Sequence, residues 1–251
     1  MTCVAPVPSV APKSLSAASA SDDERPHTLS VDVGSTWIRA LVLDGRGHPV
    51  RPLHEVGFAK TPSHPTPEAL METVASLGTR AEPFGRASIG FPGVLHDGIV
   101  CRSAVFGPEW MEVPLAPLME LRLRCPVKAV RAIDLHGWGV IHGRGTELLL
   151  AVGSRMDVAL FRDGVPVPNM TLGKYRPDPA RFELDGPAAW TRRFWKMAAD
   201  LRKRFHYDRL YIGGPYAGRM GMIPLPSDVT ITASLNGLLG GVAPWDGRRY
   251  C

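Results

Sequence analysis

Residues 29–45 read LSVDVGSTWIRALVLDG, and this stretch decides the fold more than any other part of the chain. Two apolar-rich runs, 29–33 and 37–43, flank a short Gly-Ser-Thr turn. Strand-forming runs on either side of a small polar turn are typical of a β-hairpin. The stretch therefore predicts two strands that begin the folded part of the chain.

The turn also carries groups that suit phosphate chemistry. Gly34 would let the backbone approach a ligand closely, while Ser35 and Thr36 would offer hydroxyl and N–H groups to an anionic oxygen. Asp32 precedes the turn, where a carboxylate can hold hydrated Mg²⁺ against a phosphate. The pattern is short, so a plain hairpin and a phosphate-binding turn with a metal ligand both remain open at this point.

Composition places the chain among globular proteins. Its 251 residues are 45% hydrophobic and 21% charged, enough to bury a core in one domain or two small lobes. No apolar run approaches the roughly 20 residues that a membrane span needs, so we expect no membrane partner. Residues 1–27 are rich in Ala, Ser and Pro and lack the apolar centre of a secretory signal. We expect them to form a disordered tail.

Cysteine usage and charge exclude further classes. The four cysteines, Cys3, Cys101, Cys125 and Cys251, are widely spaced, which argues against a zinc site or a disulfide framework and suits a reducing cytoplasm. The net charge is +5, but the basic residues are spread along the chain apart from a cluster at 192–204. We interpret that cluster as a solvated helix face and expect no nucleic-acid partner.

Periodicity beyond the hairpin predicts alternating strands and helices. The expected helices are 67–80, with Thr66 as N-cap, then 117–124, 135–142, 186–205 and a Gly-rich 234–242. The expected strands, after a third one within 48–60, are in 86–100, 126–132, 147–154, 158–161 and 209–212. This order predicts two α/β lobes with a central cleft, divided as 28–134 and 135–251.

Six segments, in this order, resemble the ROK family of sugar kinases, and most of all its polyphosphate/ATP glucokinases. They read DVGST, IGFPGVLHDGIV, PVKAV, ALFRDGVPVPNMTLGK, LYIGGP and SLNGLLGGV and span roughly 29–245. The resemblance implies two ribonuclease H-like lobes of the actin-like ATPase fold that close over a phosphate donor and a sugar. It further implies Mg²⁺ with ATP or polyphosphate as cofactors of an active member, and by analogy a homodimer.

The resemblance weakens where the chemistry should be. In the family, the strand PVxV leads into Asn-Asp, whose Asp accepts the proton of the sugar hydroxyl. Without gaps, Arg131 and Ala132 stand at those two positions, and Gly137 then falls on the family's helix glycine. A shift of two residues would instead make Asp134 the base. Asp134 is also placed to be the N-cap of the following helix.

The second phosphate loop of the family, Gly-Thr-Gly-x-Gly, corresponds to residues 153–157. Gly153 and Ser154 fit the pattern, whereas Arg155 and Asp157 replace glycines. The two replacements add bulk, and Asp157 adds a charge that repels phosphate. Arg155 could itself contact a phosphate. The loop is therefore no longer built for a triphosphate.

Sugar and nucleotide recognition are altered as well. The family's Glu-x-Gly-His, which holds the sugar hydroxyls, corresponds to a segment with Thr171 and Lys174 at the two polar positions. Gly93 of IGFPGVL is the further sugar-side residue that the resemblance implies. Gly213 and Gly214 resemble the Gly-Gly beside which the nucleotide lies, although they could equally end a strand without a ligand.

Two functional hypotheses follow. The first is a degenerate kinase that binds sugars or sugar phosphates, or regulates a protein partner. The positive groups at Arg131, Arg155 and Lys174 would favour an anionic ligand such as a sugar phosphate. The alternative is an active hexose or cyclitol kinase, with Asp134 as base and Asp32 holding Mg²⁺.

Overall fold

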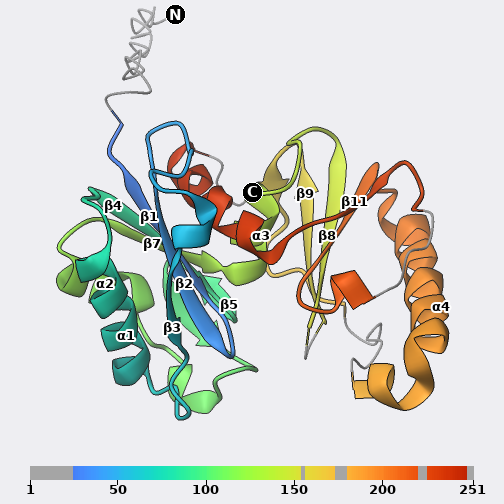
Figure 1. Cartoon of the computed structure of the whole chain (residues 1–251), viewed down its shortest axis with the longest axis horizontal. Coiled ribbons are helices and arrows are strands. Elements are labelled where there is room, and N and C mark those ends of the chain that lie inside the picture. Colours follow the sequence, from blue (N-terminus) through green and yellow to red (C-terminus); the bar gives the residue numbers. More distant parts are fainter. Residues whose placement is uncertain (1–24, 154–155, 173–179, 220–224, 248–251) are drawn as a thin grey trace, which may run out of the picture.

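The computed structural model describes residues 25–153, 156–172, 180–219 and 225–247, which form two lobes side by side (Figure 1). Each lobe is built on a mixed five-stranded sheet, so the chain has the predicted α/β class with two lobes. The expected tail falls, up to residue 24, outside the described residues. Within them, no helix is long and apolar enough to cross a membrane.

The first lobe contains the predicted hairpin. Its sheet has the order β3-β2-β1-β4-β7, in which β1 pairs antiparallel with β2 and parallel with β4, and β4 pairs parallel with β7. The strands are β1 (Thr28–Val33), β2 (Trp37–Leu43), β3 (Gly57–Lys60), β4 (Arg86–Phe91) and β7 (Val127–Arg131). All six residues of β1 and of β4 are buried.

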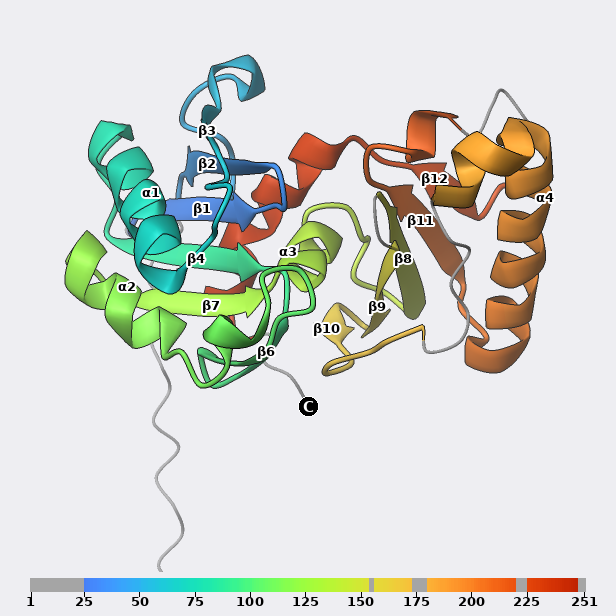
Figure 2. The same cartoon turned by 90° about the horizontal axis from the view of Figure 1, so that it is seen from below.

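Helices pack on one face of this sheet (Figure 2). They are α1 (Pro67–Arg80) and α2 (Leu115–Leu123), accompanied by the short strands β5 (Val94–His96) and β6 (Ile99–Arg102) and by the 3₁₀ turn η3 (Pro108–Trp110). A second 3₁₀ turn, η2 (Leu53–Glu55), packs instead against Leu41 and Leu43 of β2 on the other face. The predicted bounds of α1 are confirmed, and Thr66 is its N-cap because its side chain accepts a hydrogen bond from the Ala69 N–H.

The second lobe repeats the plan. Its strands are β8 (Thr146–Val152), β9 (Met156–Arg162), β10 (Val165–Pro166), β11 (Arg209–Gly213) and β12 (Val229–Ile231), in the order β10-β9-β8-β11-β12. One long element, α4 (Ala180–Phe205), covers the sheet, interrupted at Gly186 by a non-helical backbone with φ 77°. Its predicted apolar residues Trp190, Phe194, Met197 and Leu201 are all buried in the core of this lobe.

A short helix and the last element join the lobes. The helix α3 (Ala132–Trp138) lies between the two sheets, and η5 (Ser234–Trp245) returns from the second lobe to pack on α3 and β1 (Figure 1). The elements pack closely here because glycines leave room for the backbone or an aromatic ring of a neighbouring element. A Cβ on Gly137 of α3, for example, would lie 2.2 Å from the Phe161 ring of β9. The expected division after residue 134 therefore falls inside α3.

Three predictions about elements need correction. The helix expected at 135–142 is α3 at 132–138, because β7 passes directly into it, and Arg131 rather than Asp134 is its N-cap residue. The closing helix is a 3₁₀ helix that continues to Trp245 across Pro244. The helix expected at 186–205 begins at Ala180 and is broken at Gly186, whereas the third strand lies within the expected 48–60, at its last four residues.

Candidate functional site

The predicted site residues gather where parallel strands end. In the first lobe, Asp32 lies near the end of β1, Gly93 follows β4, and Arg131 ends β7. In the second lobe, Gly153 follows β8, and Gly213 ends β11. Because parallel strands end at the same edge of a sheet, each set lies together, as ligand sites of α/β sheets commonly do.

The Gly-Ser-Thr turn is held by its own hairpin. The Gly34 N–H donates to the Trp37 carbonyl oxygen at 3.0 Å, and a Cβ on Gly34 would lie 2.7 Å from that oxygen. The Thr61 hydroxyl donates to the Gly34 carbonyl at 2.8 Å. The hairpin itself therefore requires a glycine at 34, and the Gly34 N–H is already hydrogen-bonded within the hairpin. Ser35 and Thr36 are exposed at the tip of the turn.

Asp32 is a buried carboxylate that faces a histidine and an arginine side chain. Its Oδ2 lies 3.1 Å from the His136 Nε2 of α3 and 3.8 Å from the Arg39 Nη1 of β2. Burial of the imidazole opposes protonation, but the adjacent Asp32 carboxylate outweighs it and raises the pKa of His136 above its ordinary value. The sequence did not single out His136, because its pairing with Asp32 arises only when α3 packs against β1.

These residues do not fit Mg²⁺. The metal prefers an octahedral shell of oxygen ligands and keeps several waters. Here Asp32 is the predicted ligand, and its Oδ2 already faces the His136 Nε2. Among the described residues, no three His, Cys, Asp or Glu side chains group together in a way that could hold a metal ion.

Arg131 connects the two lobes. Its guanidinium is buried, and its Nη2 donates to the Val158 carbonyl at 3.0 Å and lies 3.3 Å from the Asp157 Oδ1, both on β9 of the second lobe. Its Nη1 lies 3.7 Å from the Asp134 Oδ1 within its own lobe. One cation therefore bridges a carboxylate of each lobe (Arg131 between Asp134 and Asp157).

Asp134 lies in the first turn of α3 and has no exposed surface. A general base has to come within about 3 Å of the hydroxyl that it deprotonates. Ala132, the first residue of α3, offers no proton acceptor.

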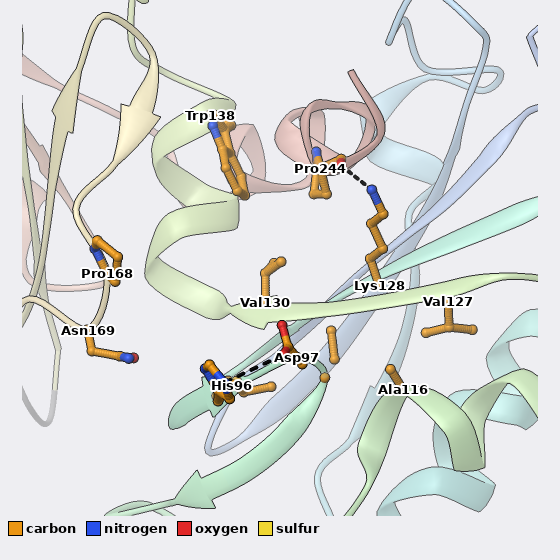
Figure 3. A pocket seen from close by; sticks show the side chains of 13 residues that line it. His96, Asp97, Ala116, Val127, Lys128, Val130, Trp138, Pro168, Asn169 and Pro244 are labelled. Carbon is orange, nitrogen blue, oxygen red and sulfur yellow. Dashed lines mark hydrogen bonds and ion pairs between the residues drawn. The ribbon is translucent and has the colours of Figure 1, made fainter. Parts of the chain in front are cut away.

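A cavity of about 700 Å³ lies between the lobes (Figure 3). It follows the edge strand β7 from Val127 to Val130 and is bounded by Trp138 of α3 and by the loop of Pro168 and Asn169 from the second lobe. The remaining lining residues are Leu95, His96, Asp97, Gly98, Ala116 and Pro244. Its volume is within the range of small-molecule sites.

The cavity adjoins the predicted sugar motifs in both lobes. Val130 directly precedes Arg131, Leu95 follows Gly93 closely, and Asn169 shortly precedes Thr171, which is exposed. None of the described sugar-side residues lines the cavity itself. Three predicted residues, Ser154, Arg155 and Lys174, lie outside the described part of the chain, so their positions relative to the cavity are not described.

The glycines of the second lobe have structural reasons of their own. Gly214 has φ 90°, and a Cβ there would lie 2.4 Å from the Val152 carbonyl oxygen. The Tyr216 N–H donates to that same oxygen at 3.0 Å. The turn after β11 therefore needs a glycine at 214 whether or not a nucleotide binds beside it.

Comparison with known proteins agrees with this architecture. Residues 28–147 match the model of the ROK family. An inorganic polyphosphate/ATP-glucomannokinase from Arthrobacter sp. strain KM superposes with a TM-score of 0.75 at 21% identity, covering 86% of this chain and 96% of that one. No curated protein sequence gives a significant match.

Two further structures show the range of proteins with this fold. A ROK family glucokinase from Streptomyces griseus, in complex with glucose and AMPPNP, has a TM-score of 0.65 at 16% identity over 85% of this chain and 97% of that one. A ROK family transcriptional regulator, a homolog of the E. coli MLC protein, has a TM-score of 0.58 at 10% identity over 85% and 77%. The resemblance of this chain to the ROK family is thus confirmed, in sequence across its first lobe and in fold across both lobes.

Proposed function

We propose that this protein is a degenerate ROK sugar kinase, which binds a sugar or sugar phosphate between its lobes and does not transfer phosphate. Its role would then be binding or regulation, either alone or with a protein partner. The observation that carries the proposal is Arg131, a buried cation tied to both lobes where the resemblance expects the acceptor side of the active site.

On the acceptor side, neither of the two described positions that the resemblance offers for the base, 132 and 134, presents an exposed carboxylate. In the ungapped register Ala132 stands where the family has its Asp, and a positioned base contributes about 10²–10⁴-fold to the rate. The alternative base, Asp134, is fully buried and forms an ion pair with Arg131. Activity through Asp134 would require α3 to move and this pair to break.

The phosphate side of the cleft is altered as well, and Arg131 takes part in this change through Asp157. Asp157 stands where the family loop has a glycine, and its carboxylate accepts both from the Arg131 guanidinium and from the Val158 N–H at 2.8 Å. These contacts hold a carboxylate at the start of β9, at a position where the family resemblance expects a glycine near the phosphate. Transfer from ATP or polyphosphate is disfavoured for that reason.

The cavity is the ligand site that we infer. It combines the Trp138 ring and an apolar strand edge with a few polar groups, among them Asn169 and Lys128, as small-molecule sites usually do. The Arg131 charge is balanced by two carboxylates and adds little attraction for an anion. A preference for sugar phosphates over sugars would therefore depend on Lys128, which lines the cavity, and on Arg155 and Lys174. A cytoplasmic location and a homodimer remain expectations of the same proposal.

Calorimetric titration tests the ligand. Glucose, mannose, myo-inositol and glucose 6-phosphate are titrated into the wild type and into His96→Trp, which places an indole at the rim of the cavity. The matched control is His54→Trp, since the His54 side chain is equally exposed and lies away from the cavity. We expect at least one ligand to bind, and to bind at least tenfold more weakly to His96→Trp alone. Equal affinity in all three proteins, or no binding by any ligand, would contradict the site.

A further inference from the structure

The Asp32 carboxylate is surrounded by side chains from neighbouring elements of the fold. Three elements converge on this carboxylate: β1 supplies Asp32, β2 supplies Arg39 directly opposite in the strand register, and α3 supplies His136. The Asp32 side chain is only 6% exposed, and the His136 imidazole and the Arg39 guanidinium both lie within 4 Å of its Oδ2. The carboxylate is therefore enclosed by groups of the protein itself.

The imidazole is held in place by the last element of the chain. The η5 backbone at Gly237 lies directly against the His136 ring, since a Cβ on Gly237 would be 2.2 Å from the ring Cδ2. A Cβ on Gly240 would similarly lie 2.0 Å from the Leu135 carbonyl oxygen, so η5 packs on α3 along its length. The ring cannot turn toward η5 to leave the carboxylate without displacing that backbone.

This arrangement conflicts with a metal at Asp32. A divalent cation next to the carboxylate would meet Arg39 at close range and would have to displace the His136 nitrogen from one carboxylate oxygen. Mg²⁺ also binds with its own shell of waters, which needs open space around the carboxylate. We propose that Asp32 is not a metal ligand in this chain, because His136 and Arg39 already hold the place that the family resemblance gives to Mg²⁺.

The proposal is independent of the ligand in the cavity, and it makes a positive prediction as well. If His136 keeps the metal out, then removing the imidazole should open the carboxylate to a divalent cation. Mn²⁺ is a suitable probe, because the electron paramagnetic resonance signal of the free ion falls on binding and needs no enzymatic activity.

The experiment titrates Mn²⁺ into the wild type, His136→Ala and the double variant His136→Ala/Asp32→Asn, each checked for folding by circular dichroism. The control is His48→Ala, since His48 pairs with Asp44 on the surface in the same way, with Nδ1 3.5 Å from Oδ2. We expect no Asp32-dependent binding in the wild type or the control, at least tenfold tighter binding by His136→Ala, and loss of that gain in the double variant.

Two results would overturn the proposal. Mn²⁺ binding by the wild type that Asp32→Asn removes would show that the carboxylate is a metal ligand after all. Failure of a folded His136→Ala to gain affinity would refute the part assigned to His136, and Arg39→Gln, which leaves α3 untouched, repeats the test if His136→Ala does not fold. Neither result bears on sugar binding, so this proposal and the proposed function can fail separately.

Discussion

At the scale of single residues, Arg131 explains most of what distinguishes this cleft. Arg131→Met removes the charge but keeps most of the volume, and it deprives the buried Asp134 of a cationic partner. Removing one member of a buried ion pair is strongly destabilising. We expect the free energy of unfolding to fall by about 3 kcal/mol in urea titrations.

Two further variants test whether the loss of stability in Arg131→Met comes from breaking a buried ion pair. Arg131→Met/Asp134→Leu removes both charges and should recover much of the loss, because an apolar pair of similar volume can replace a buried ion pair. Arg122→Met breaks the surface pair with Glu68 and should cost at most about 1 kcal/mol. If Arg131→Met lowered the free energy of unfolding no more than Arg122→Met does, the ion pairs of Arg131 would not stabilise the packing of the two lobes.

His136 gives the stability a pH dependence with a defined sign. Its pKa is raised in the folded protein, so its pairing with Asp32 contributes fully below the unfolded value of about 6.5 and is lost as the pH rises through the folded pKa. Arg39 opposes this shift and Asp157 supports it. The stability difference between the wild type and His136→Gln, measured by urea unfolding, should be largest near pH 5.5 and should shrink toward pH 9. A difference that stays constant across this range would show that the pair does not titrate.

The residues at the site fall into two groups, those whose positions the neighbouring sequence predicts and those whose positions depend on packing between distant elements. Arg131 and Ala132 could be placed by the sequence, because their register follows from the adjacent strand β7 and the helix glycine Gly137. His136 could not, since its partner lies about a hundred positions away in the chain and meets it only through packing. The bridge from Arg131 to Asp157 could not be predicted either, since the two residues belong to different lobes and meet only when these pack together.

At the scale of elements, α3 depends on one close contact. Gly137 packs against the Phe161 ring of β9, where a Cβ would lie 2.2 Å from the ring atoms. Gly137→Ala should therefore force the ring or the helix to move and cost about 1–3 kcal/mol. Thermal or urea unfolding measures the loss, and a second change, Phe161→Leu, should recover part of it.

The control for this helix is Gly218→Ala, because a Cβ at Gly218 would meet no atom within 4 Å. We expect its stability to stay within about 0.5 kcal/mol of the wild type. Equal stability of Gly137→Ala and Gly218→Ala would mean that α3 is not pressed against the second lobe.

Elements with strong periodicity were predictable and those at junctions were not. The bounds of α1 follow from Thr66, Pro67 and the apolar spacing, all of which are local signals. The start of α3 has no such signal, because β7 enters the helix without a loop and Arg131 caps it without a side-chain hydrogen bond. The same applies to η5, which packs closely on α3 and extends past the predicted end, across Pro244.

At the scale of the whole molecule, the order of the six motifs was enough to indicate two lobes of the actin-like fold. The activity is a property of a few side chains within that frame, and the same fold also occurs in a transcriptional regulator. The function that we propose therefore depends on Arg131, Ala132 and Asp157 rather than on the fold.

The central claim is that the folded protein does not transfer phosphate, and a coupled phosphotransfer assay tests it most directly. ATP and polyphosphate serve as donors with Mg²⁺, a panel of hexoses and cyclitols serves as acceptors, and Asp134→Asn is assayed in parallel. We predict no turnover above the background for any pair of donor and acceptor. Turnover by the wild type that Asp134→Asn abolishes, in a variant that still folds, would establish a kinase with Asp134 as its base and contradict the account.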